Sequence, residues 1–154
     1  MIKRQVRIQR LAAVTAEYRA ANSARVLLDL ELQTNPNFGN PYGWTQRAGR
    51  DFRVNLQATY IVRLYAEFEA TLRDYWSKCL KRDSEPQMVQ LVNFSIPGEY
   101  FPQDYIDGAD EVRSYRNRIV HDSGDESDGV FPTLTIEQVE RSLRSYLSRL
   151  QSNW

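Results

Sequence analysis

The chain has 154 residues, of which 42% are hydrophobic, so it can bury the core of a single domain spanning residues 1–154. Its 20 basic and 20 acidic side chains balance at neutral pH, which excludes a strongly basic nucleic-acid-binding class and leaves only local RNA binding. The single cysteine, Cys79, cannot form a disulfide within the chain. No apolar stretch has the length of a membrane span, and the start of the chain lacks the apolar run of a signal peptide. We therefore expect a cytoplasmic protein with no membrane partner.

The first half of the chain is typical of a helical hairpin. Apolar residues recur at helical spacing over about residues 3–32, with no proline or glycine between them, and predict one long helix. Residues 35–44 are dense in asparagine, proline and glycine and end that helix. A single wide apolar stripe over about residues 51–80 predicts a second long helix, which is the strongest core element of the chain.

The second half predicts shorter helices. Residues 88–94 favour a short helix, and residues 96–102 an irregular aromatic connection. A third main helix should begin at about Asp104 or Asp110 and end at His121, with Gly108 leaving its start open. The last helix should begin near Thr135, which forms a capping-box pattern with Gln138. Since no segment has the pattern of a strand, the predicted fold class is all-α, an up-and-down bundle of four to five helices.

The segment that ends at His121 contains the candidate site. His121 is the only histidine of the chain, and four residues separate it from Arg116. On a helical wheel Arg113, Asn117 and His121 share one polar ridge, whereas Arg116 points with the apolar residues. A guanidinium on an apolar arc needs a carboxylate, a carbonyl, a phosphate or a partner subunit, because an unpaired buried charge is costly.

These residue types suit chemistry on a phosphodiester. Arg116 can stabilise the charge that develops on a phosphate, His121 can transfer a proton near neutral pH, and Asn117 can orient either side chain. RNA supplies its own nucleophile, the 2′-hydroxyl, so such a site requires neither a metal nor another cofactor. Its products would be a 2′,3′-cyclic phosphate and a 5′-hydroxyl. We take Arg116, His121 and Asn117 as candidate catalytic residues and Arg113 and Arg118 as candidate RNA-binding residues.

The six residues Arg116-Asn117-Arg118-Ile119-Val120-His121 resemble the motif of the HEPN superfamily, the all-helical domains of many RNA-cleaving toxins and defence effectors. In that motif four to six residues separate the arginine from the histidine, and a polar residue follows the arginine. The stretch Tyr65–Leu72 is similar to the long helix that precedes it. The resemblance implies an HEPN-like fold and a homodimer in which two motifs face each other across one cleft. Arg116 and His121 would be catalytic, and Asn117 would support them.

One position after the motif departs from the family pattern, and two other segments need an interpretation. Some toxin–antitoxin members have a tyrosine two residues after the histidine, where this chain has Ser123, so regulation by modification of that tyrosine is not expected. The acidic residues of the loop 122–129 are interpreted as a solvated turn. The aromatic rings of residues 35–44 are interpreted as a cap on the end of the bundle, with stacking on RNA bases as the alternative.

The leading hypothesis is a metal-independent endoribonuclease with no cofactor, acting as a homodimer on RNA. It could be the toxin of a toxin–antitoxin or defence system, with a cognate antitoxin as a partner protein. One alternative is a non-catalytic HEPN-like module that binds RNA, a nucleotide or a protein. Another is a helical bundle that serves only protein interactions. Two simpler roles also remain open, a helix-terminal role for His121 and a salt bridge between Arg116 and Glu69.

Overall fold

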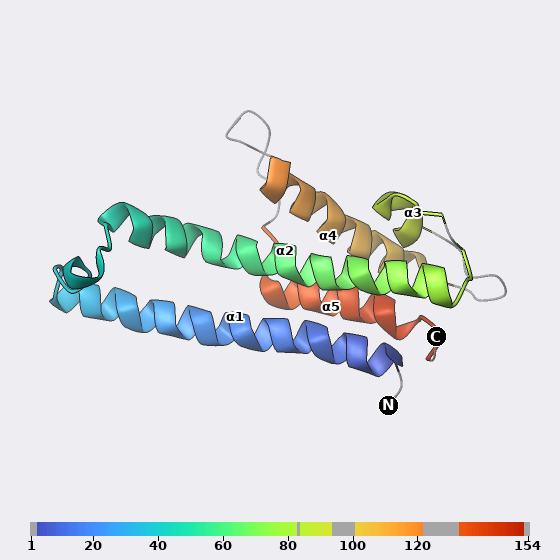
Figure 1. Cartoon of the computed structure of the whole chain (residues 1–154), viewed down its shortest axis with the longest axis horizontal. Coiled ribbons are helices and arrows are strands. Elements are labelled where there is room, and N and C mark those ends of the chain that lie inside the picture. Colours follow the sequence, from blue (N-terminus) through green and yellow to red (C-terminus); the bar gives the residue numbers. More distant parts are fainter. Residues whose placement is uncertain (1–2, 83, 94–100, 122–132, 153–154) are drawn as a thin grey trace.

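The chain forms a bundle of helices. The computed structural model describes residues 3–82, 84–93, 101–121 and 133–152, and every regular element among them is helical. The five α-helices are α1 (Lys3–Thr34), α2 (Gln46–Lys78), α3 (Met88–Val92), α4 (Gln103–His121) and α5 (Ile136–Ser148). Along the four longer ones the chain reverses direction from each helix to the next (Figure 1). The predicted all-α class with four to five helices is confirmed.

Helices α1 and α2 form a long hairpin whose turn contains the short 3-10 helix η1 (Asn40–Tyr42). Gly43 follows η1 with a φ of 70°, a left-handed conformation that favours glycine. Thr45 then caps α2, because its hydroxyl accepts a hydrogen bond from the Ala48 amide at 3.1 Å. The predicted start of the second helix at residue 51 was therefore wrong by five residues, since the cap at Thr45 was not recognised.

Helix α4 starts at Gln103, close to the earlier of the two predicted starts, and Gly108 lies inside it. A side chain at Gly108 would lie 3.4 Å from the Ser142 hydroxyl of α5, so this glycine allows the two helices to approach closely. At the start of α5 the predicted capping box is confirmed. The Gln138 amide donates to the Thr135 hydroxyl at 3.2 Å, and the Thr135 amide donates to Gln138 Oε1 at 2.8 Å.

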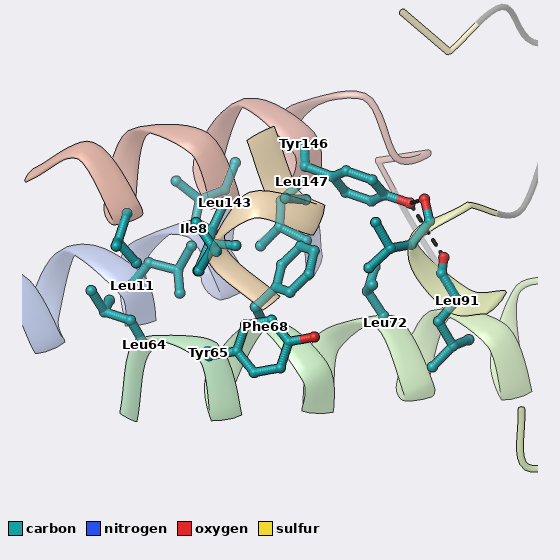
Figure 2. Close-up of a cluster of buried hydrophobic side chains, with 14 of the residues drawn as sticks. Ile8, Leu11, Leu64, Tyr65, Phe68, Leu72, Leu91, Leu143, Tyr146 and Leu147 are labelled. Carbon is teal, nitrogen blue, oxygen red and sulfur yellow. Dashed lines mark hydrogen bonds between the residues drawn. The ribbon is translucent and has the colours of Figure 1, made fainter. Parts of the chain in front are cut away.

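The core lies where the second half of α2 meets the other four α-helices (Figure 1). Phe68 of α2 and Tyr146 of α5 meet there edge to face, with ring centroids 5.3 Å apart. The Tyr146 hydroxyl donates to the backbone oxygens of Leu91 at 3.3 Å and Val92 at 2.9 Å, and so fastens α3 to α5 (Figure 2). Because these carbonyls and the hydroxyl are buried together, the bonds satisfy groups that water does not reach.

The far end of the α1–α2 hairpin extends beyond the other helices (Figure 1). Apolar side chains that the sequence placed on helical stripes are largely exposed there, with Leu27 at 68% and Val54 at 69%. Tyr42 and Trp44 of the turn are also exposed, so the prediction that these rings cap the bundle was wrong. The physical reason is length, because α5 has 13 residues and cannot cover helices of 32 and 33 residues.

Asp74 of α2 anchors the opposite end of the hairpin. Its carboxylate lies 3.0 Å from Arg7 and 3.3 Å from Lys3 of α1, and it also pairs with Lys78 one turn along α2. The Asp74 side chain is 12% exposed, so its charge is held in place by several cations rather than by water. The acidic loop 122–129, Ser123 and residues 96–100 of the predicted aromatic connection lie outside the described residues.

We expect Tyr146→Phe to lower the free energy of unfolding by about 1 to 2 kcal/mol, because the buried carbonyl oxygens of Leu91 and Val92 would lose their donor. Tyr65→Phe is the matched control. No described residue hydrogen-bonds to the Tyr65 hydroxyl, so its removal should cost nothing. Urea unfolding followed by circular dichroism measures both values, and an equal loss in the two variants would contradict the role of Tyr146.

We also expect the protein to lose stability in alkali. Burial of Tyr146, and secondarily the charge of Tyr75, raises the pKa of its hydroxyl above the ordinary value of 10.0. The folded state then keeps a proton that the unfolded chain releases, so this contribution is complete below about pH 10 and declines above it. The free energy of unfolding should fall by up to about 1.4 kcal/mol per pH unit. Urea titrations on both sides of this pH should show a shallower decline for Tyr146→Phe, and parallel curves would refute the assignment.

Candidate functional site

Three of the five predicted site residues line one hollow between helices α2, α3 and α4. The hollow has a volume of about 290 Å³. It is lined by Tyr65 and Glu69 of α2, by Gln87, Met88 and Val89 at the start of α3, and by Arg113, Arg116 and Asn117 of α4. The helical spacing of the three α4 residues turns them toward α2, so the geometry brings two guanidinium groups and an amide to one surface.

Arg116 is half-buried in this hollow. Its guanidinium carbon lies 5.8 Å from the centre of the Tyr65 ring, and its Nη1 donates a hydrogen bond to Asn117 Oδ1 at 3.0 Å. In the described part of the chain it forms no ion pair. The positive charge expected on the apolar arc therefore meets an aromatic face and a neutral amide, which leaves that charge uncompensated.

The neighbouring charges in the hollow are already paired. Arg113 donates from Nε to Asp110 Oδ1 at 2.7 Å, and this bond, with the charge of Asp110, raises the pKa of its guanidinium. Glu69 accepts two hydrogen bonds from Arg73, at 2.7 and 3.0 Å, along its own helix. The salt bridge between Arg116 and Glu69, which the sequence left open, is therefore absent among the described residues, because Glu69 pairs with Arg73 four positions along its own helix.

Tyr65 forms the inner wall of the hollow. Its side chain is 2% exposed, and its hydroxyl has no hydrogen-bond partner among the described residues. Burial raises the pKa of this hydroxyl, and the charge of Glu69 raises it further, while the nearby Arg113 and Arg116 act in the opposite direction. The phenol consequently keeps its proton at neutral pH and is a hydrogen-bond donor.

His121 does not belong to this hollow. It is the last residue of α4, its side chain is exposed, and no described residue forms a hydrogen bond or ion pair with it. Five positions along a helix correspond to a rise of about 7.5 Å and a rotation of about 140°. Within one chain the side chains of Arg116 and His121 therefore point away from each other.

Arg118 also lies away from the hollow. Its guanidinium carbon is 5.5 Å from the centre of the Tyr115 ring, on a different side of α4 from Arg116. Of the predicted site residues, the structure therefore brings together Arg113, Arg116 and Asn117, and it leaves His121 and Arg118 apart.

The contributions of α2 and α3 to the hollow are not apparent from the sequence. Tyr65 lies on the apolar stripe of the second helix, which predicts a place in the core or on a dimer surface, and the structure buries it in the core. A buried tyrosine usually needs a partner for its hydroxyl, and this was the available signal for the hollow. Met88 and Val89 come from a helix of five residues, which carries no periodic pattern that could orient them.

A second hollow of about 570 Å³ adjoins the first, because Gln87 lines both. Its walls include Arg73, Trp76 and Arg82, and the guanidinium carbon of Arg82 lies 4.7 Å from the centre of the Trp76 ring. Glu85 also lines this second hollow, and Arg73 is paired with Glu69, so its lining carries charges of both signs.

Comparison with protein-family models, with curated proteins and with solved structures found no match to this chain. Among the described residues there is no group of three or more histidine, cysteine, aspartate or glutamate side chains placed to hold a metal ion. None of the described helices combines the length and the apolarity that crossing a membrane requires. The functional interpretation therefore depends on the geometry of the hollow and on the motif.

We expect the free energy of unfolding of Arg116→Met to equal that of the wild type or to exceed it by up to about 1 kcal/mol. Methionine is a neutral side chain of similar length, so it keeps the contact with Tyr65 while the uncompensated charge is removed. Arg7→Met is the control, because Arg7 pairs with Asp74 and its loss should cost about 1 kcal/mol. Urea unfolding distinguishes the two. A marked destabilisation by Arg116→Met would mean that the guanidinium has a structural partner.

Proposed function

We propose that the protein is a metal-independent endoribonuclease of the HEPN type that acts as a homodimer. Such an enzyme would act as the toxin of a toxin–antitoxin or defence system, and an antitoxin protein would regulate it. The observation that carries the proposal is the half-buried guanidinium of Arg116, which has no carboxylate partner among the described residues. A phosphate oxygen of RNA is an anion that this charge could neutralise.

The proposal includes a homodimer because the side chain of His121 points away from that of Arg116 within one chain. A guanidinium and an imidazole that diverge by about 140° on one helix reach a common phosphodiester more easily when they come from two copies. Two α4 helices that approach each other near their C-terminal ends would bring Arg116 of one protomer toward His121 of the partner subunit. Asn117, hydrogen-bonded to Arg116, would hold the guanidinium in place.

The proposed reaction is a transfer of the phosphoryl group within the RNA. The imidazole of His121 accepts the proton of the 2′-hydroxyl, and the 2′-oxygen forms a bond to phosphorus while the bond from phosphorus to the 5′-oxygen breaks. The protonated His121 then donates this proton to the leaving 5′-oxygen, so one imidazole serves first as the base and then as the acid. Arg116 stabilises the charge on the non-bridging oxygens in the transition state. The products are a 2′,3′-cyclic phosphate and a 5′-hydroxyl.

We expect the purified protein to cleave single-stranded RNA in the presence of EDTA. Arg116→Ala and His121→Ala should each lower the rate by about 100-fold or more, because each removes a group that acts in the transition state. Arg47→Ala is the matched control, since it removes an exposed arginine at the far end of the hairpin. Gel electrophoresis with end-group analysis measures the rate and identifies the cyclic phosphate.

A mixing experiment tests the composite site. Arg116→Ala and His121→Ala, each inactive alone, should recover part of the wild-type activity when mixed and allowed to exchange subunits. Recovery follows because a mixed dimer contains one intact Arg116 facing one intact His121. Cleavage that Arg116→Ala does not affect, or light scattering that shows a monomer at micromolar concentration, would count against the proposal.

The second candidate is a non-catalytic module that binds RNA or a nucleotide. It is favoured by the separation of His121 from the hollow that contains Arg113, Arg116 and Asn117. Binding of RNA by the wild type, lost in Arg116→Ala and retained in His121→Ala, with no cleavage by any of the three proteins, would select this function over the endoribonuclease.

A further inference from the structure

The Tyr65 hydroxyl is a buried donor without an acceptor in the described part of the chain. Buried polar groups are almost always hydrogen-bonded in folded proteins, because leaving one unpaired costs free energy. Figure 2 shows the contrast with Tyr146, whose hydroxyl is joined to two backbone oxygens, whereas no bond is drawn to the hydroxyl of Tyr65. Since phenylalanine would fill the same place in the stripe at no such cost, the hydroxyl of Tyr65 requires an explanation.

The surroundings of Tyr65 indicate what kind of group could accept its hydrogen bond. Tyr65 lines the hollow together with Arg116, whose guanidinium lies beside its ring. The charges near the hydroxyl are Glu69 on its own helix and Asp110, Arg113 and Arg116 on α4. Arg113 is paired with Asp110, and Glu69 with Arg73, so one positive charge remains. A ligand with a single negative charge and free acceptor oxygens complements this arrangement, and a phosphodiester has both properties.

The hollow is also larger than a phosphate group needs. Its volume is about 290 Å³, and Met88 and Val89 supply apolar walls on the side of α3. Apolar side chains of this kind suit the flat face of a base or the edge of a ribose, while a free inorganic anion would leave them unused. The lining therefore favours a whole nucleotide unit rather than a small ion.

We propose that the hollow between α2, α3 and α4 binds one nucleotide unit of a phosphodiester, with the Tyr65 hydroxyl donating to a non-bridging oxygen beside the Arg116 guanidinium. The choice of ligand rests on the proposed function and deepens it, because it adds a substrate-binding residue and a nucleotide subsite to the same surface. Tyr65 then acts in binding, and it transfers no proton to or from the reacting oxygens.

The test is calorimetric titration of the full chain with a nucleoside 2′,3′-cyclic phosphate, a singly charged diester. Tyr65→Phe should weaken binding by about tenfold to a hundredfold, as loss of a hydrogen bond to a charged group does. Tyr75→Phe is the matched control. It makes the same chemical change at another buried tyrosine of α2, which does not line the hollow, and it should bind as the wild type does. A urea midpoint of Tyr65→Phe at or above that of the wild type excludes a loss of structure.

Two other kinds of result would contradict the inference, one against the role of Tyr65 and one against the nucleotide subsite. Equal affinity of Tyr65→Phe and the wild type, or no binding by the wild type, would remove the role of Tyr65. Inorganic phosphate that binds as tightly as the cyclic nucleotide would overturn the nucleotide subsite. The inference and the endoribonuclease proposal fail separately. Binding that depends on Tyr65 without any cleavage would defeat the enzyme alone, while cleavage with normal binding by Tyr65→Phe would defeat the inference alone.

Discussion

Burial of the second half of α2 is the constraint on which the rest of the structure depends. Ile61, Leu64, Phe68 and Leu72 are fully buried there, and α2 is the one helix among the described elements that contacts α1, α3, α4 and α5. Removing this much apolar surface from water is the main stabilising contribution that the bundle has. It also fixes the site, because α4 packs against the part of α2 that contains Tyr65, and this contact turns Arg116 toward the ring.

The hollow contains two groups that cost stability in the described part of the chain, the uncompensated charge of Arg116 and the unpaired hydroxyl of Tyr65. Elsewhere in the bundle many polar groups are paired, including Asp74 and the capping box of α5, although the Thr15 hydroxyl of α1 is also buried without a hydrogen-bond partner among the described residues. The hollow differs because an unpaired donor and an uncompensated charge lie in it together. Proteins commonly keep such costly groups where they bind a ligand, because a free charge and a free donor are then ready for it. This pattern, more than the motif alone, makes the α2–α3–α4 hollow the best candidate site.

Most of the fold could be predicted from local patterns. The periodicity of residues 3–32 and 51–80 gave two long helices, and Thr135 with Gln138 located the start of α5, because both signals depend on neighbours in the sequence. The site was predicted only in part. The ridge on α4 placed Arg113 and Asn117 together, but the approach of Tyr65 and Met88 to Arg116 depends on how distant helices pack, which periodicity does not encode. The exposure of Leu27 and Val54 was also not predicted, because it depends on how far α5 reaches along the hairpin, and the periodicity of α1 and α2 does not contain that length.

The unequal lengths of the helices have a consequence for the way the molecule opens. Beyond the end of α5, the α1–α2 hairpin is held mainly by contacts between its own two helices and by pairs such as Arg53 with Asp29. Segments with few buried apolar contacts open at a lower free energy than the core does. Backbone amides near Leu27 and Val54 should therefore exchange with deuterated solvent well before those near Phe68. The hairpin would loosen from its tip, while the part of α2 against which α4 and its Arg116 pack stays closed.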